Sequence, residues 1–262
     1  MHTWKPDAYG AAPGAVGTLL AGGVTSCAFL CILRIYQICC ASGDFAFISP
    51  MLIFMGLLSM AVAGVFMVGQ QDYKRMLAYS SVEHMGILIL GLGLGAPALF
   101  ATLLHLINNG LTKGVLFLSA GNIHRSFGST RSTVVRGALH RLPVSAGLFL
   151  AGFLAITGSP PFGPFISEFS ILKAGFESGH FVASGLFLLF LLVIFIGMGA
   201  TVLQVVQGQE PEDAPRTAYR EGVLTIAPPL LLLGLVLVMG VYIPEPVKVL
   251  LQNAAVFLEV RP

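Results

Sequence analysis

The sequence has few charged residues, and this shortage limits what the protein can be. Asp, Glu, Lys and Arg make up 10% of the 262 residues, against about 25% in an ordinary soluble domain. Because so few charges cannot cover a globule of this size, much of the surface must face lipid. The 14 basic and 12 acidic residues give a net charge of +2, which is too small for a nucleic-acid-binding surface. We therefore expect a lipid bilayer around the chain and no nucleic acid.

Motifs for cofactors are also missing. The sequence has no Gly-rich loop ending in Gly-Lys-Ser/Thr, no cysteine cluster for an iron–sulfur centre and no His-x-x-x-His pair. The four cysteines, Cys27, Cys31, Cys39 and Cys40, all lie in the first apolar segment, where we expect them to be buried in a helix. We expect no cofactor and no metal in this chain, and no active site of its own.

The N-terminus does not have the pattern of a cleaved secretory signal, because no basic region leads into an apolar core and a small-residue site. Residues 1–7 instead predict a polar loop that runs into an apolar stretch.

Long apolar segments fill most of the chain. A helix that crosses a membrane needs about 20 mostly apolar residues. The candidate segments are roughly 14–40, 46–69, 76–95, 97–120, 143–157, 181–206 and 222–243. They predict an all-α, polytopic bundle of transmembrane helices. The polar connections include the arginine-containing residues 121–142 and a mixed-charge linker at 207–221, and we expect the tail, 245–262, at the membrane interface.

One apolar region is interrupted by helix-breaking residues. Residues 157–164 read Thr-Gly-Ser-Pro-Pro-Phe-Gly-Pro, and this run of prolines and glycines cannot continue a helix. A break at membrane depth is tolerated where it is buried in protein or lines a polar cavity, and such breaks often mark transport sites. The pattern predicts a discontinuous helix around 157–168. An ordinary turn outside the membrane is the alternative.

Charged groups inside a membrane cost about 2.5–3.5 kcal/mol each, so each one requires an explanation. Asp72 and Lys74 lie at a helix entrance, where their side chains can reach the interface. Glu83 and His84 fall near the middle of a predicted span and point to different helix faces, so we expect them to meet different partners. Both are candidates for handing on a proton. A structural Glu83 paired with an arginine of another helix is the alternative.

A second polar group follows on the next predicted helix. His105, Asn109 and Lys113 are spaced i, i+4, i+8 and share one face over about 12 Å. That face is expected to point into the bundle, with Asn109 and water filling the gap between His105 and Lys113. Polar contacts between helices, without transport, are the alternative. Glu168 follows the proline-glycine break, where freed backbone groups make a polar site for a carboxylate.

These residues carry a family resemblance. The string from Gln71 to Gly86 resembles the signature of the antiporter-like membrane subunits of complex I, group 4 [NiFe] hydrogenases and multisubunit Na⁺/H⁺ antiporters. Residues 159–169, Ser-Pro-Pro-Phe-Gly-Pro-Phe-Ile-Ser-Glu-Phe, resemble the broken twelfth helix of that family. The string Ser-Ser-Val-Glu-His-Met-Gly, which ends at Gly86, is most similar to hydrogenase-4 component F.

The resemblance implies roles for individual residues. Lys74 matches the helix-entrance lysine of the family, Lys113 its central lysine and His105 a histidine of the proton wire. Glu168 matches the titratable site on the broken helix. Two positions depart from the pattern. Ser26 stands where relatives usually carry a lysine in the seventh helix, and Asn109 stands where many carry a second histidine.

The resemblance also predicts the organisation of the chain. Family members have about fourteen helices that include two inverted repeats. Residues 1–69 match the remainder of the first repeat with two spans, residues 70–206 the second repeat, and residues 207–262 a linker, a last helix and a tail. The chain therefore resembles the C-terminal portion of a family member, from about the seventh helix onward.

The implied function is proton translocation in a redox-driven membrane complex, either hydrogenase-4-like or NADH:quinone oxidoreductase-like. Protons would move through a buried relay of Lys113, Glu168, His105, Glu83, His84, Lys74, Asp72 and Asn109. The expected partners are other membrane-arm subunits and a hydrogenase or NADH-oxidising module, in the cell (inner) membrane. A Na⁺/H⁺ antiporter subunit and a structural subunit without transport are the alternatives.

Overall fold

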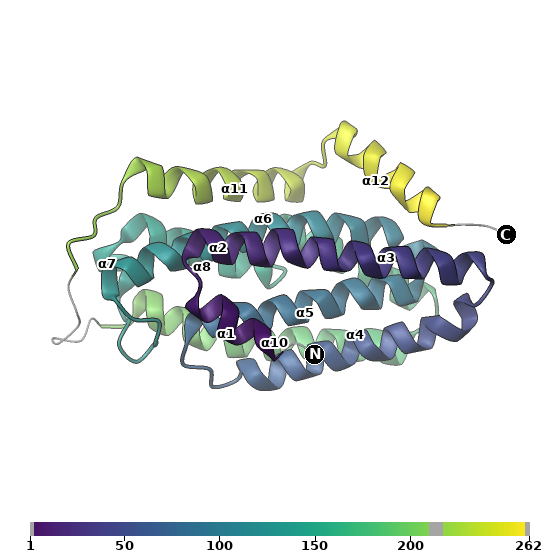
Figure 1. The fold of residues 1–262 in the computed structure, drawn as a ribbon, viewed down its shortest axis with the longest axis horizontal. Helices are drawn as coiled ribbons and strands as arrows, with labels where there is room; N and C mark the ends of the chain where they lie inside the picture. The colour runs from purple at the N-terminus through teal and green to yellow at the C-terminus, as the bar shows by residue number, and fades with distance from the viewer. Residues whose placement is uncertain (1–2, 210–216, 260–262) are drawn as a thin grey trace.

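The computed structural model describes residues 3–209 and 217–259, and these residues fold into helices without a strand. The helices are α1 (Trp4–Ala11), α2 (Gly14–Thr18), the π-helix η1 (Leu19–Val24), α3 (Thr25–Ala41), α4 (Phe45–Met67), α5 (Tyr73–Leu94), α6 (Ala96–Phe127), α7 (Ala138–Arg141), α8 (Pro143–Ile156), α9 (Gly163–Glu177), α10 (Phe181–Gln207), α11 (Val223–Val241) and α12 (Glu245–Leu258). The long helices run side by side along the longest axis of the molecule (Figure 1). The prediction of an all-α bundle is confirmed.

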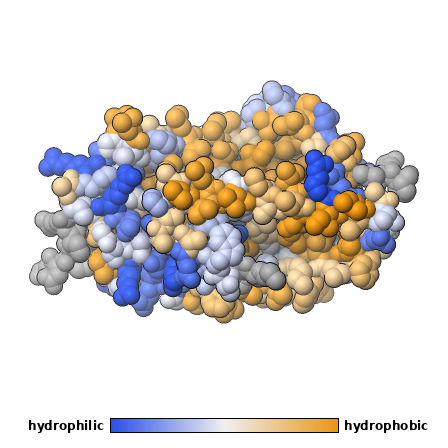
Figure 2. Space-filling model, viewed as in Figure 1, coloured by the Kyte–Doolittle hydropathy of each residue, from blue (hydrophilic) through white to orange (hydrophobic). Residues whose placement is uncertain are grey.

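Within residues 3–209 and 217–259, five helical segments are long and apolar enough to cross a membrane. They are Gly14–Ala41 (α2, η1 and α3 together), Phe45–Met67, Tyr73–Leu94, Phe181–Gln207 and Val223–Val241. Hydrophobic side chains cover the middle of the face in Figure 2, and hydrophilic ones gather at the end where α1 and α7 lie. This distribution fits a protein whose outer helices face lipid.

The helices differ in how deeply they are buried. In the most apolar stretch of α5, 83% of the residues are buried, against 22% in α4. The buried face of α4 carries small residues, and a Cβ atom at Gly56 would lie 2.7 Å from the carbonyl oxygen of Gly86 in α5. Small residues allow this close backbone approach between membrane helices. The inner helix α5 is therefore screened from lipid and can hold polar side chains.

The discontinuous helix is present where the sequence predicts it. Helix α8 ends at Ile156 and α9 begins at Gly163, with turns in between. Pro160 and Pro161 have no N–H to continue the ladder, and Gly158 takes a positive φ of 67°. Pro164 then sits in the first turn of α9, where proline is well tolerated.

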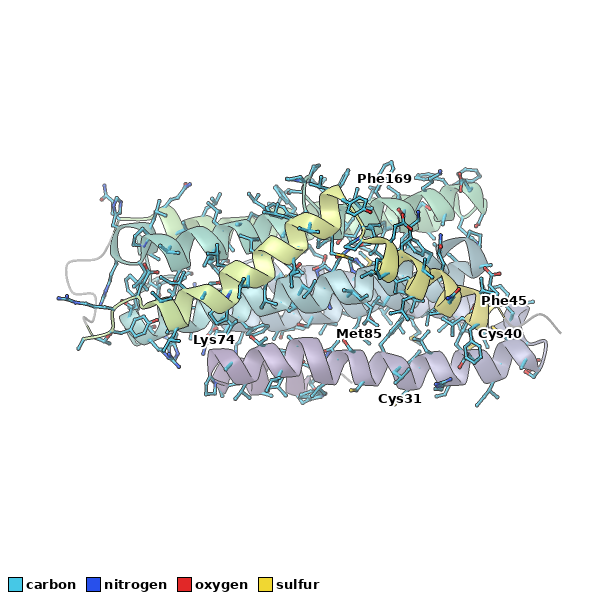
Figure 3. All side chains as sticks on the ribbon, turned by 90° about the horizontal axis from the view of Figure 1, so that it is seen from above. Cys31, Cys40, Phe45, Lys74, Met85 and Phe169 are labelled. Atoms are coloured by element: carbon cyan, nitrogen blue, oxygen red, sulfur yellow. The ribbon has the colours of Figure 1, made fainter. Side chains whose placement is uncertain are left out.

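Three expectations for the chain need correction. Residues 4–7 of the expected polar loop at 1–7 belong to helix α1, while residues 1–2 lie outside the described residues, and α6 continues through residues 121–127 of the expected polar connection. The cysteines are not buried: Cys27 and Cys31 are exposed, and Cys39 and Cys40 are partly exposed. The reason is the position of α3 along one side of the bundle, with Cys31 turned away from the other helices (Figure 3).

The C-terminal region is described only in part, because residues 210–216 of the expected linker and 260–262 of the tail lie outside the described residues. Helix α12 is amphipathic. Its residues Leu251, Ala255 and Leu258 are buried, whereas Leu250 and Phe257 are exposed. One face of the tail therefore packs against the bundle.

Candidate functional site

Helices α5 and α6 form a buried hairpin that carries most of the predicted polar residues. Gly95 joins them with a φ of 76°, a conformation that suits glycine. The helices approach closely, because a Cβ atom at Gly91 would overlap the Thr102 hydroxyl. Lys74 lies near one end of α5 and Met85 near its middle (Figure 3), which places the neighbouring Glu83 and His84 well inside the bundle.

A histidine pair connects the two helices at this level. His84 Nδ1 lies 3.0 Å from His105 Nε2, and both residues are fully buried. On its other side, His105 Nδ1 lies 3.0 Å from Ser167 Oγ in α9. A neutral imidazole has one protonated and one free nitrogen, so each ring can accept a proton on one side and release one on the other.

Glu168 lies beside this pair. It belongs to the second turn of α9, is 5% exposed, and has its Oε1 atom 4.0 Å from His84 Nδ1. Oε1 has no hydrogen-bond partner among the described residues. A Cβ atom at Gly158 would overlap Glu168 Oε2, so the glycine in the break leaves room for the carboxyl group. The prediction that Glu168 lies deep in the protein next to a helix interruption is confirmed.

Lys113 follows His105 on α6 by about two helical turns. It is fully buried, and its Nζ donates to Ser80 Oγ at 2.8 Å and to the Leu77 carbonyl oxygen at 3.3 Å. Glu83 follows one turn after Ser80 on α5. Its Oε2 lies 4.0 Å from His84 Nε2, and its Oε1 has no partner among the described side chains. Glu83 and His84 meet different groups, as expected, and they also approach each other.

The stripe along α6 is buried but is not a continuous connection. His105, Asn109 and Lys113 are 0%, 2% and 0% exposed, so the prediction that they face the bundle is confirmed. However, Asn109 Oδ1 has no partner in the described part of the chain. The groups between Lys113 and His105 come from α5 instead. The neighbouring Asn108 donates weakly to Ser167 Oγ at 3.5 Å.

At the start of α5, the side chain of Lys74 does not lie where the sequence predicts. Asp72 is partly exposed and caps α5, where its carboxylate accepts from the backbone N–H groups of Lys74 and Arg75. Lys74 does not reach the interface, because it is 1% exposed. Its Nζ donates to the Ala12 carbonyl oxygen at 3.0 Å and lies 3.3 Å from His124 Nδ1. Lys74 therefore forms a second buried polar contact, apart from the histidine pair.

Ser26, which stands where the family usually has a lysine, lies just after the π-helix η1. Its hydroxyl donates to the Gly22 carbonyl oxygen at 2.6 Å, within the same segment. π-Helical turns are frequent at functional sites, but Ser26 offers no group that titrates.

Sequence reasoning missed four residues of this network: Ser80, Asn108, His124 and Ser167. Ser80 and Ser167 lie in the two segments that resemble the family, but a serine in a membrane helix does not by itself indicate a functional site. His124 lies 11 residues after Lys113, which is close to three helical turns. That spacing could have indicated a shared face.

His84, His105 and Glu168 also offer three ligand atoms within 4.8 Å of one another, which is a possible metal-binding geometry. The two nitrogens face each other at hydrogen-bond distance. At this distance one nitrogen can carry a proton and the other accept it. The geometry favours proton sharing, and the absence of a cofactor stays a prediction.

Comparison with known proteins identifies the family of this chain. The family model described as "NADH:quinone oxidoreductase/Mrp antiporter, TM" matches residues 1–197. The hydrogenase-4 component F homolog of Methylacidiphilum infernorum is 33% identical over 263 residues, which cover 99% of this chain and 53% of that protein. NADH-quinone oxidoreductase subunit N of Desulforudis audaxviator is 35% identical over 189 residues, which cover 70% of this chain and 37% of that protein.

A solved structure shares the fold. A chain of the membrane-bound sulfane sulfur reductase, an archaeal respiratory membrane complex, aligns with a TM-score of 0.87 and 27% identity. The alignment covers 98% of this chain and 52% of that one, so the chain spans about half the length of these relatives. With its spans, its broken helix and this match, the chain is an integral multi-pass membrane protein that belongs to the family described as NADH:quinone oxidoreductase/Mrp antiporter, TM.

Proposed function

We propose that this chain conducts protons in a redox-driven membrane complex similar to hydrogenase-4, through a relay centred on the His84–His105 pair. The observation that carries the proposal is the position of that pair. It touches α9 through Ser167, lies 4.0 Å from Glu168, and faces Glu83 on its other side. Titratable groups from three helices thus meet at one buried point.

The relay runs from Lys113 through Glu83 to His84, and from there to His105 and Glu168. The separations of 4.0 Å on either side of His84 exceed a direct hydrogen bond, and a water molecule bridging each gap would complete the path. Each step moves one proton from a donor nitrogen or carboxyl group to the next acceptor. Because burial makes the charge of each group sensitive to its neighbours, a charge change near Lys113 would drive protons along the row.

Lys74 and Asp72 mark the other end of α5, and we assign them to proton entry. Lys74 contacts His124 rather than Lys113. Lys113 donates to Leu77 and Ser80, which follow Lys74 on α5 by about one and two helical turns. The Lys74–His124 pair would exchange protons with the loop side of the bundle, where Asp72 is partly exposed.

The partners follow from the relatives. Hydrogenase-4 component F and subunit N of NADH-quinone oxidoreductase are named as parts of redox enzymes. We therefore assign this chain other membrane-arm subunits, a hydrogenase or NADH-oxidising module that would hold the redox cofactors, and a place in the cell (inner) membrane.

The experiment is proton flux through the chain in its native complex, reconstituted into vesicles under a potassium diffusion potential and followed with a pH-sensitive dye. Glu168→Gln keeps the shape of the side chain but cannot titrate. We expect flux per assembled complex to fall at least about tenfold, as for loss of an acid–base group. Glu177→Gln, on the same helix and exposed beside Lys173, is the matched control. Unchanged flux in Glu168→Gln would refute the relay.

A Na⁺/H⁺ antiporter subunit is the second candidate, because the matching family description includes the Mrp antiporter. The two functions respond to different driving forces. Proton movement on addition of H₂ or NADH would support the redox-driven complex, whereas movement on addition of a Na⁺ gradient alone would support the antiporter. Flux under neither condition, nor under the imposed potential, would leave a structural role.

A further inference from the structure

The last membrane helix, α11, makes direct backbone contact with the break between α8 and α9. A Cβ atom at Gly240 would overlap the Pro161 carbonyl oxygen and lie 2.5 Å from the Phe162 carbonyl carbon and 2.7 Å from the Gly163 nitrogen. Helix α11 crosses the bundle diagonally (Figure 3). It reaches the break at Gly240, one residue before its own end at Val241. No side chain separates the two backbones at this point.

On its inner side, the same short segment packs against two buried polar side chains, Asn108 and Glu168. A Cβ atom at Gly163 would lie 2.5 Å from Asn108 Oδ1, and one at Gly158 would overlap Glu168 Oε2. The break is therefore enclosed between α11 on one side and Asn108 and Glu168 on the other. A displacement of its backbone on the α11 side must be transmitted to these two side chains, because close-packed interiors have little free space.

We propose that Gly240 is a positioning residue, which sets the place of the break and through it the distance between the Glu168 carboxyl group and His84. This inference rests on the proposed function. The separation between Glu168 Oε1 and His84 Nδ1 is 4.0 Å, a gap that a small movement closes or opens. Displacements of about 1 Å at a reacting group can cost a hundredfold in rate, so a methyl group at the α11 contact should affect proton transfer.

The chain offers a matched control on the same helix. Gly240→Ala and Gly234→Ala make the same chemical change in α11, but a Cβ atom at Gly234 would meet nothing within 4 Å. We expect about tenfold lower proton flux per assembled complex in Gly240→Ala, and normal flux in Gly234→Ala. The vesicle assay under a potassium diffusion potential measures both.

A second readout separates positioning from lost stability. The rate at which a membrane-permeable carbodiimide modifies Glu168, followed by peptide mass spectrometry, reports the surroundings of that carboxyl group. We expect this rate to change in Gly240→Ala and to stay constant in Gly234→Ala. A lower melting temperature with unchanged labelling and unchanged flux per folded complex would show that Gly240 serves packing alone, and would overturn the proposal.

Two further variants keep the test decisive if Gly240→Ala does not assemble. Met239 is 6% exposed and Val238 is 47% exposed on the same turn of α11. Met239→Ala loosens the helix beside the break, so we expect altered labelling of Glu168 and lower flux, with Val238→Ala as the unaffected control. Identical labelling in both would overturn the proposal.

The outcomes for this inference and for the proposed function are distinct. If Glu168→Gln lowers flux but Gly240→Ala behaves like Gly234→Ala, the positioning role is wrong and the relay stands. If Glu168→Gln leaves flux unchanged, the relay itself is wrong, whatever Gly240→Ala does.

Discussion

Replacement of Lys113 tests the relay most directly, provided that the substitution preserves packing. Lys113→Ala would remove most of a fully buried side chain, and large-to-small core substitutions cost about 2–5 kcal/mol. Lys113→Met keeps an unbranched chain of similar length. It loses the hydrogen bonds from the ammonium group to Ser80 and Leu77, each worth about 1.5–3 kcal/mol, but it also removes the cost of burying that ammonium group. We therefore expect assembly to survive in Lys113→Met.

The expected result is loss of proton flux in Lys113→Met with a near-normal amount of assembled complex, because methionine has nothing to titrate. Lys113→Arg adds a second comparison. Arginine donates to the same oxygen atoms but stays protonated in proteins, so we expect it also to block flux. Lys173→Met, at an exposed lysine paired with Glu177, controls for general effects of removing a lysine.

The assay compares proton flux with the quantity of assembled complex in the same vesicles. If Lys113 serves only as a contact between α5 and α6, then Lys113→Arg should restore both assembly and flux, and any loss in Lys113→Met should follow the amount of complex. Normal flux per assembled complex in Lys113→Met would refute the role assigned to this residue.

Two further predictions concern the ends of the network. Asp72→Ala should lower the stability of the chain by about 1 kcal/mol, because the carboxylate caps α5 at two backbone N–H groups; a thermal melt of the purified complex that matches wild type would contradict this. Asn109→Leu should leave proton flux near normal, because the unpartnered Oδ1 atom of Asn109 lies outside the relay that runs through α5; the vesicle assay measures it, and a collapse of flux would restore the stripe along α6 as the route.

The break and the burial of Glu168 could be predicted from the sequence because their causes are local. Two prolines without N–H groups end a helix wherever they occur, and a carboxylate between apolar segments cannot face lipid without a large cost. The inward direction of His105 and Lys113 followed from helical spacing on one element. Each of these inferences needs the neighbouring residues alone.

The contact between His84 and His105 could not be predicted in this way, because it depends on the register of two helices. That register is fixed by the turn at Gly95 and by the close approach at Gly91. The sequence places the two histidines 21 residues apart and indicates no distance between them. The prediction that Lys74 reaches the membrane interface was wrong for a similar reason. Its Nζ donates to Ala12, at the end of helix α1, whose first residues were expected to belong to a polar loop.

The interruption between α8 and α9 would allow the proposed relay to cross the bundle sideways rather than follow one helix. Two contacts come from the second turn of α9: Ser167 reaches His105, and Glu168 approaches His84. An unbroken helix would fix the direction of this turn to that of α8, whereas the break frees it, and Gly158 within the break leaves room for the Glu168 carboxyl group because it has no side chain. The break thus gives α9 an orientation that is independent of α8. The proposed proton path depends on this orientation of α9, because it lets three helices bring titratable groups together at a single level.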